Sequence, residues 1–307
     1  MTKNIIITGS IVYDRIMDFP GFFRDHIMPD KIHNLSVSFV VNKQKINFGG
    51  TAGNIGYNLK LLGENPIIFS QAGDDFSDYK KWLANNKISD KEIKIIKNKN
   101  TATAYIMTDK SDSQITALYL ETMGVPAKVS SAKIKSYNPA SVIISPGNVQ
   151  DMVETARACK KLGIPYIADP GQQIPALSAR QLLFLIKGAQ VLMCNDYELE
   201  LINKSLKPAS LAGRHRSIEA LKCLVEILVV TYGAKGSVIY NGSKSIKIKA
   251  NKPKRIIDPT GAGDAYRAGF IKGLINGWDL KKCGELAAQI AKYPVEHYGT
   301  QEHKFKF

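Results

Sequence analysis

Short apolar runs alternate with longer segments of helical period from about residue 139 onward. Four short runs are rich in β-branched residues, as buried strands are: residues 141–145, 164–168, 191–194 and 227–231. The segments between them repeat apolar positions every three or four residues, which predicts three helices: one that contains Met152 and ends at Gly163, and two over residues 177–186 and 218–225. This alternation predicts a parallel sheet that is covered by helices.

The N-terminal part of the chain breaks this alternation. One strand and two helices are still predicted there, at residues 3–8, 51–62 and 76–86. Four other stretches alternate in the strand period, at residues 35–41, 45–48, 103–108 and 114–120. The simplest architecture is one α/β domain over residues 1–307, from which parts of residues 15–48 and 101–122 project as a small second sheet.

Composition narrows the class of protein. With 44% hydrophobic and 22% charged residues in 307, the chain is ordinary for a folded domain, which disfavours collagen-like, coiled-coil and disordered classes. The net charge is +15, but the lysines are scattered and form no stripe with aromatic residues, so we expect no nucleic-acid partner. No apolar run approaches the roughly 20 residues that cross a bilayer, so we expect no membrane partner and a cytoplasmic location.

The four cysteines do not suggest a metal or redox site. Cys159, Cys194, Cys223 and Cys283 are widely separated and form no C-x-x-C pair, so neither structural zinc nor redox chemistry is indicated. Reduced thiols fit this spacing.

The segment with the clearest chemistry is residues 258–264 (DPTGAGD), which follows the strand-like residues 255–257 and precedes a predicted helix over residues 265–274. Its glycines permit a tight turn, so the amides of Gly261, Ala262 and Gly263 would be free at a helix N-terminus, where an anion is favoured. Asp264 beside them could accept a proton from an attacking hydroxyl. The alternative is a glycine-rich turn in which Asp264 is an ordinary helix cap. No G-x-x-x-x-G-K-[ST] motif is present, which excludes a P-loop as the phosphate site.

These residues resemble a known family. Residues 258–270 look like the C-terminal signature of the ribokinase family of carbohydrate and nucleoside kinases, and residues 49–54 (GGTAGN) look like its N-terminal signature. Narrower matches to the bacterial adenosine kinases lie at residues 8–14, 17–21, 36–39, 169–173, 195–198 and 299–301. The resemblance covers nearly the whole chain. It implies a three-layer α/β/α domain with a mostly parallel central sheet, in which the small second sheet is a lid.

The resemblance also implies catalytic roles. Asp264 matches the family's catalytic base, and Gly261, Ala262 and Gly263 match its anion hole. Asn195 and Glu198 match a motif that organises the phosphates of ATP and a hydrated Mg²⁺, with Glu198 contacting the metal through water. From the residues alone, Asn195 could equally cap the next helix, with Glu198 in its first turn.

Substrate and nucleotide positions follow from the same resemblance. The positions that match sugar-binding residues are Asp14, Gly50 and Asn54; those that surround the nucleoside are Ser10, Ser38, Gln172 and Gln173; those near the nucleotide are Thr231, Gly233, Gly236 and Thr260. A carboxylate such as Asp14 can accept hydrogen bonds from two vicinal hydroxyls. As alternatives, Asp14 could be a solvated loop acid and Asn54 an ordinary polar residue of a helix.

One departure concerns the base. Two aromatic positions that sandwich the base in bacterial adenosine kinases are Ala104 and Leu118 here, so stacking would need Tyr105, Tyr119 or Phe39 instead.

The function implied is an ATP- and Mg²⁺-dependent kinase that phosphorylates the 5'-hydroxyl of a ribonucleoside, with adenosine converted to AMP. The alternatives are a sugar kinase of the ribokinase or fructokinase kind, a nucleoside kinase of broad specificity, and a nucleotide-binding regulator that has lost catalysis. Exposed lid edges also suggest a homodimer through the lid strands.

Overall fold

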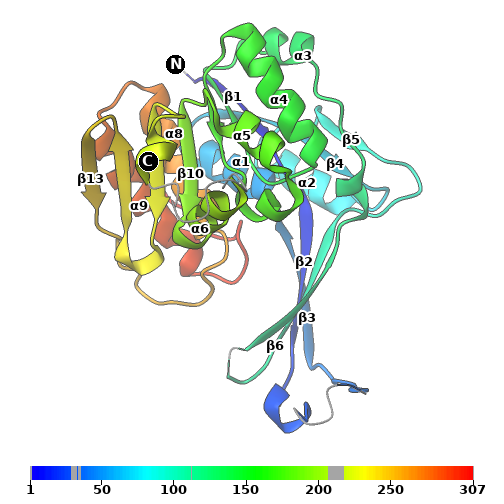
Figure 1. The fold of residues 1–307 in the computed structure, drawn as a ribbon. Helices are drawn as coiled ribbons and strands as arrows, with labels where there is room; N and C mark the ends of the chain where they lie inside the picture. Colours follow the sequence, from blue (N-terminus) through cyan, green and yellow to red (C-terminus); the bar gives the residue numbers. More distant parts are fainter. Residues whose placement is uncertain (1, 29–32, 34–35, 112, 207–217, 307) are drawn as a thin grey trace.

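The computed structural model describes residues 2–28, 33, 36–111, 113–206 and 218–306. Its centre is a nine-stranded sheet in the order β13-β12-β11-β10-β9-β8-β1-β4-β5 (Figure 1). All neighbouring pairs from β11 to β5 are parallel, and β12 and β13 add an antiparallel hairpin at one edge. The strands are β1 (Asn4–Thr8), β4 (Asn65–Ala72), β5 (Ile93–Ile95), β8 (Ser141–Ile144), β9 (Tyr166–Ala168), β10 (Val191–Asn195), β11 (Ile227–Thr231), β12 (Ser237–Asn241) and β13 (Lys244–Ile248).

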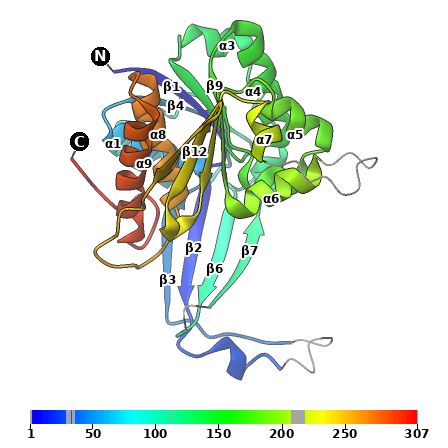
Figure 2. The same ribbon diagram turned by 60° about the vertical axis from the view of Figure 1, so that its left-hand side comes forward.

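Helices cover both faces of this sheet, and Figure 2 shows the two helical layers on either side of it. One layer contains α1 (Thr51–Leu61), α2 (Ser77–Asn85), α8 (Ala262–Ile275) and α9 (Leu280–Val295). The other contains α3 (Ser131–Ser136), α4 (Val149–Leu162), α5 (Ala179–Ile186), α6 (Asp196–Ser205) and α7 (Ile218–Lys222). The expected three-layer α/β/α architecture with a mostly parallel sheet is confirmed.

The strand β1 illustrates why the sequence folds this way. Successive side chains of a strand point to opposite faces, so Ile5 and Ile7 pack in the core below α1 and α8, whereas Ile6 packs in the core below α4. All three are fully buried. A strand that is covered on both faces is therefore continuously apolar, which is the pattern that the sequence presents.

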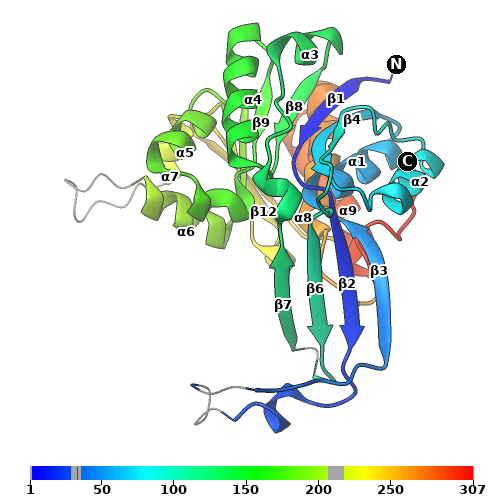
Figure 3. The same cartoon turned by 90° about the vertical axis from the view of Figure 1, so that its right-hand side faces the viewer.

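The second sheet is the lid, which has four strands in the order β3-β2-β6-β7. They are β2 (Val12–Asp18), β3 (Lys43–Gly49), β6 (Thr103–Thr108) and β7 (Gln114–Tyr119). Figure 3 shows these strands projecting away from the large domain. The hairpin predicted at residues 103–120 is confirmed, and β2 pairs with β3 and β6 at the centre of the lid.

Two strand predictions were wrong. Of the strand expected at residues 35–41, residue 35 lies outside the described residues, and residues 36–41 form no strand. The reason is aromatic packing: Phe39 contacts Phe19 and Phe23, with ring centroids 4.9 and 5.2 Å apart, and so belongs to a cluster at the lid tip. Its place in the sheet is taken by β2, which the sequence analysis left without an element.

The strand expected at residues 255–257 is also absent, because these residues have no strand neighbour. Instead, the N–H group of Ile257 donates to the carbonyl oxygen of Val295 at 2.8 Å, and this hydrogen bond attaches the segment to the C-terminal end of α9. Among the described residues, we find no helix with the length and apolar character that crossing a bilayer requires.

The close contact between α8 and α9 provides a stability test. A Cβ at Gly269 would lie 2.7 Å from the Cα of Ala287, so Gly269→Ala should cost about 1–3 kcal/mol of steric strain and lower the thermal midpoint by several degrees. Gly124→Ala is the matched control, because a Cβ there would meet no atom within 4 Å. Thermal unfolding followed by circular dichroism measures both. Equal thermal midpoints for Gly269→Ala and the control would show that α8 and α9 can move apart to admit the added methyl group without loss of stability.

Candidate active site

Two helix N-termini meet at the carboxyl ends of the parallel strands, where open α/β sheets bind ligands. Gly50 precedes α1 with φ of 87°, and a Cβ there would lie 2.5 Å from the carbonyl oxygen of Ser10. Gly261 precedes α8 with φ of 81°, and a Cβ there would lie 2.9 Å from the Cβ of Thr300. Both positions therefore require glycine. The N–H groups of Thr51 and Ala52 at the start of α1 donate to Ser10, so the start of α8 is the one that can offer its amides to an anion.

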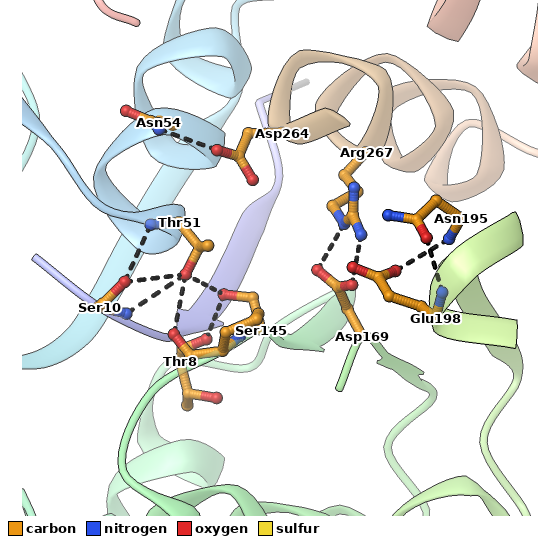
Figure 4. Close-up of polar contacts among 11 residues, drawn as sticks. Thr8, Ser10, Thr51, Asn54, Ser145, Asp169, Asn195, Glu198, Asp264 and Arg267 are labelled. Carbon is orange, nitrogen blue, oxygen red and sulfur yellow. Dashed lines mark hydrogen bonds and ion pairs between the residues drawn. The ribbon is translucent and has the colours of Figure 1, made fainter. Parts of the chain in front are cut away.

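Asp264 lies in the first turn of α8, half-buried, and points toward α1 (Figure 4). The side-chain amide of Asn54 donates from Nδ2 to Asp264 Oδ2 at 2.8 Å. The sequence analysis placed both residues in the site but did not foresee this direct contact. A carboxylate that is held in place by one hydrogen bond keeps its other oxygen available to accept a proton.

The surroundings of Asp264 make it a stronger base than a solvated carboxylate. Burial raises its pKa to about 6, with smaller raising effects from Asp169 and Glu198, while Arg267 and the Asn54 hydrogen bond oppose the rise. A carboxyl group with this pKa is largely ionised at neutral pH and still close enough to it to take a proton effectively. This is the balance that general base catalysis requires.

Arg267 is a site residue that the sequence analysis missed. It lies one turn after Asp264 on α8, and its Nε and Nη2 both donate to the carboxylate of Asp169, just beyond β9. The Asp169 side chain is buried, and that of Arg267 is 12% exposed. The paired geometry fixes the guanidinium beside Asp264 and ties α8 to the central sheet.

Asn195 and Glu198 form a reciprocal cap at the start of α6. The N–H of Glu198 donates to Asn195 Oδ1 at 2.7 Å, and the N–H of Asn195 donates to Glu198 Oε2 at 2.9 Å. The capping alternative for these two residues is thereby confirmed. Burial raises the pKa of Glu198, and Asp169 adds to the rise while Arg267 opposes it. Both residues lie at the same edge as Asp264 (Figure 4).

Asp14 lies on β2, on the lid face that we call the inner face. This face also carries Asn47, Ala104 and Leu118, which are register neighbours in one row across the four strands. Burial raises the pKa of Asp14 to about 7, and the nearby carboxylates of Asp258 and Asp264 add to the rise. Asp14 therefore faces the same site as Asp264.

A model of the pfkB family of carbohydrate kinases matches residues 3–305. The chain belongs to this family. A nucleoside kinase of Methanocaldococcus jannaschii is 33% identical over 275 residues, which cover 89% of this chain and 87% of that protein. The structure of a Burkholderia thailandensis nucleoside kinase in complex with inosine has a TM-score of 0.83 and 31% identity, covering 98% of this chain and 94% of that one. The same enzyme with ADP-inosine has a TM-score of 0.81 and 32% identity, covering 98% and 92%.

These comparisons confirm the ribokinase-like fold of the kinase, with its large, mostly parallel sheet and its smaller lid sheet. They also confirm that the kinase is a phosphotransferase that acts on a hydroxyl group. The two relatives named above are nucleoside kinases, and the one from Burkholderia thailandensis binds inosine in its structure.

The pairing register of the lid strands shows which aromatic side chains are placed to stack on a base. In the kinase, Tyr105 and Tyr119 alternate with Ala104 and Leu118, so they lie on the opposite, outer face of the lid. Phe39 is committed to the aromatic cluster at the lid tip. None of the three replaces the aromatic pair. The inner face is aliphatic instead.

Ser10 has a different environment from the one expected for a ligand-binding residue. It is buried, and its Oγ accepts a hydrogen bond from the N–H of Thr51 at 3.1 Å. Thr51 Oγ1 in turn donates to the carbonyl oxygen of Pro146 at 2.9 Å. In the kinase, Ser10 thus anchors the start of α1 and supports the position of Gly50.

The other predicted positions lie around this edge or on the lid. Thr231 ends β11, and Gly233 and Gly236 follow in a turn with φ of 56° and 97°. Gln172 is exposed and Gln173 half-buried in the short 3-10 helix η4 (Gly171–Ala176). Ser38 is exposed in the segment between β2 and β3.

A cavity of about 730 Å³ separates the inner face of the lid from the loop that precedes α8. Ile16, Asp18 and Thr108 line it from the lid, and Asp258 and Thr260 line it from the loop. The N–H of Thr260 donates to Asp258 Oδ1 at 2.9 Å, which shapes this loop. The cavity continues the face that carries Asp14 and is wide enough for a small-molecule substrate.

The raised pKa of Asp14 predicts a pH-dependent cost in stability. Its pKa rises from 3.8 to about 7 on folding, so between these values the folded kinase binds more protons than the unfolded chain, and stability falls as pH rises. Asp14→Asn removes this cost. We expect its thermal midpoint to exceed that of the wild type by a margin that grows from about pH 5 to about pH 8. A constant margin would show that Asp14 titrates normally.

Proposed function

We propose that this kinase transfers the γ-phosphoryl group of ATP to the 5'-hydroxyl of a ribonucleoside. The observation that carries the proposal is Asp264, a carboxylate with a pKa of about 6 in the first turn of α8, beside the amides of the helix start. This arrangement places a proton acceptor next to an anion-binding site, which is what phosphoryl transfer to an alcohol needs.

In the proposed reaction, Asp264 accepts the proton of the 5'-hydroxyl as its oxygen attacks the γ-phosphorus. The new O–P bond forms while the bond from the γ-phosphorus to the oxygen of the leaving ADP breaks. N–H groups of Gly261, Ala262 and Gly263 donate to the phosphoryl oxygens, where negative charge grows. Ala262 N–H is held at 3.3 Å from the carbonyl oxygen of Pro259, a weak bond that a phosphate oxygen could displace.

The sugar would be held from both sides of the cleft. Asp14 can accept hydrogen bonds from the vicinal 2'- and 3'-hydroxyls at once, which favours its ionised form and lowers its pKa when substrate binds. Gly50 leaves room for close approach of the sugar, and Asn54 lies beside Asp264. Ser10 would contribute mainly through its support of α1.

The base would lie against the aliphatic inner face of the lid, formed around Ala104, Ile106 and Leu118. Gln172, Gln173 and Ser38 can supply adaptable hydrogen bonds to its edge. An aliphatic surface discriminates weakly among planar bases, which supports broad specificity that includes inosine and adenosine. The inosine bound by the Burkholderia thailandensis enzyme supports the same view.

ATP would occupy the edge formed by Asn195, Thr231, Gly233, Gly236 and Thr260. Within the described part of the chain, no three acidic, histidine or cysteine side chains gather into a metal site, which fits an ion held mainly by phosphates and water. Glu198 fits a hydrated Mg²⁺, because a nearby cation would stabilise its half-buried carboxylate in the ionised form. Bound Mg²⁺ would neutralise phosphate charge.

The direct test is ADP release from ATP and Mg²⁺ with adenosine, inosine, guanosine and cytidine, and with free ribose and fructose. We expect turnover with several ribonucleosides and little with free sugars, which leave the inner face of the lid uncovered. Asp264→Asn should lower kcat by at least about 10²-fold with little change in KM. Asp78→Asn, an exposed carboxylate on α2, is the matched control. Turnover of free sugars alone would overturn the nucleoside assignment.

We also propose that two copies associate through their lids. The outer face carries the exposed side chains of Ile46, Tyr105, Ile115 and Tyr119, between 40% and 47% accessible. These side chains lie on one face of the lid sheet, with Arg15 between Ile46 and Tyr105 in the register. Exposed apolar side chains gathered on one sheet face favour a self-complementary contact.

Ile115→Glu should weaken this association at least about tenfold, because it would bury a charge in the contact. Sedimentation velocity measures the effect, and Thr116→Glu on the inner face is the matched control. A wild-type monomer at micromolar concentration would contradict the proposal.

A further inference from the structure

The contact between Asn54 and Asp264 depends on which way the Asn54 amide points. A side-chain amide presents a donor on one side and an acceptor on the other. With Nδ2 toward Asp264, Asn54 stabilises the ionised carboxylate; with Oδ1 there, it would repel it. Something must therefore fix the orientation of this buried amide.

Two residues near the C-terminus contact Asn54 Oδ1. Gln301 Nε2 donates to it at 3.0 Å. Thr300 Oγ1 lies 2.6 Å from it and 3.1 Å from the carbonyl oxygen of Phe48, and its single proton goes to the nearer acceptor, Asn54 Oδ1. Both residues are buried. Asn54 Oδ1 is thus held by two donors on the side away from Asp264, which leaves Nδ2 for the carboxylate.

Gln301 is itself an amide, so its orientation also needs a cause. Trp82 Nε1 donates to Gln301 Oε1 at 2.9 Å. An indole N–H can only donate, so the oxygen of the Gln301 amide, and not its nitrogen, must face Trp82. Gln301 Nε2 then faces Asn54 and also donates to Tyr79 Oη at 2.7 Å, while Tyr79 donates to the carbonyl oxygen of Gly49 at 2.8 Å.

We propose that Trp82, Gln301 and Thr300 are positioning residues, which orient Asn54 so that an N–H rather than a carbonyl oxygen faces Asp264. The indole of Trp82 fixes which end of the Gln301 amide faces Asn54, and Gln301 in turn fixes which end of the Asn54 amide faces the Asp264 carboxylate. The inference rests on the proposed role of Asp264 as general base and extends it to residues that do not touch the substrate.

The consequence concerns the protonation of Asp264. The charged and titratable groups that act on it are Arg267 from α8, Asp169 beyond β9, Glu198 from α6, Asp14 from β2 and Tyr79 from α2. Asn54 is the neutral donor among these contacts, and its hydrogen bond lowers the pKa of Asp264. Releasing the amide should therefore raise that pKa and keep the base protonated to higher pH.

The test compares Trp82→Phe, Thr300→Val and the double variant. Thr300→Val removes a donor at nearly constant side-chain volume, whereas Trp82→Phe removes a donor together with part of the ring system, a loss of volume that the control Trp278→Phe shares. We expect the acid limb of kcat to move to higher pH, by about one unit in the double variant, while kcat at high pH stays within about threefold of the wild type. Trp278→Phe and Thr155→Val are matched controls, because Thr155 bonds within α4 in the opposite layer and Trp278 follows α8. Both controls should keep the wild-type midpoint.

The same substitutions in an Asn54→Ala background separate positioning from general structure. Without the amide, Trp82→Phe and Thr300→Val should cause no further shift of the limb. A shift that persists there, or single variants that lose amplitude with an unchanged midpoint, would overturn the proposal. If the double variant does not fold, Thr300→Val alone carries the test.

A readout that needs no turnover distinguishes this inference from the proposed function. A higher pKa of Asp264 makes the thermal midpoint of Trp82→Phe fall more steeply with pH between about 6 and 8 than that of the wild type. This steeper fall is expected even if no nucleoside proves to be a substrate. Parallel curves would overturn the positioning role alone.

Discussion

The site depends on one buried ion pair, the bidentate contact between Arg267 and Asp169. It joins α8, which carries Asp264 and the amides that we propose hold the phosphoryl group, to the end of β9. Removing one partner of such a pair leaves an uncompensated buried charge, which typically costs about 3–5 kcal/mol. Because Asp264 lies one turn from Arg267, the same contact sets both where the Asp264 carboxylate lies and how strongly its ionised form is favoured.

Much of the fold could be predicted because it rests on local patterns. The alternation of apolar runs and helical segments after residue 139 predicted the parallel sheet. Strands that are buried on both faces must be apolar throughout, as β1 in the N-terminal part also shows. The lid was harder. The segment around Phe39 has the strand period, yet its aromatic ring is drawn into the cluster at the lid tip, and β2, with its charged Asp14 and Arg15, completes the sheet instead.

The motif that contains Asp264 could also be found in the sequence, but the residues that contact it could not. Asn54 and Asp264 are 210 residues apart, and Arg267 and Asp169 are 98 residues apart. Patterns of hydrophobic and polar residues within a single helix or strand cannot predict contacts between residues so far apart in the sequence. Ser10 shows a related limit: a hydroxyl that matches a ligand position can equally anchor a helix, and only the fold decides. Asn195 and Glu198 cap α6 through their own backbone groups, which leaves the second carboxylate oxygen of Glu198 for other partners.

The strict alternation of side chains in β6 and β7 gives the lid two independent surfaces. Substitutions at Ala104 and Leu118 change what the cleft admits, whereas substitutions at Tyr105 and Tyr119 change what the molecule presents outward. With the roles that we propose for the two faces, substitutions that change substrate preference and substitutions that change self-association can therefore arise separately within the same few residues. An insertion or deletion of one residue would instead exchange the inner and outer side chains of the strand at once. Changes in the length of β6 and β7 should therefore be tolerated far less than substitutions within them.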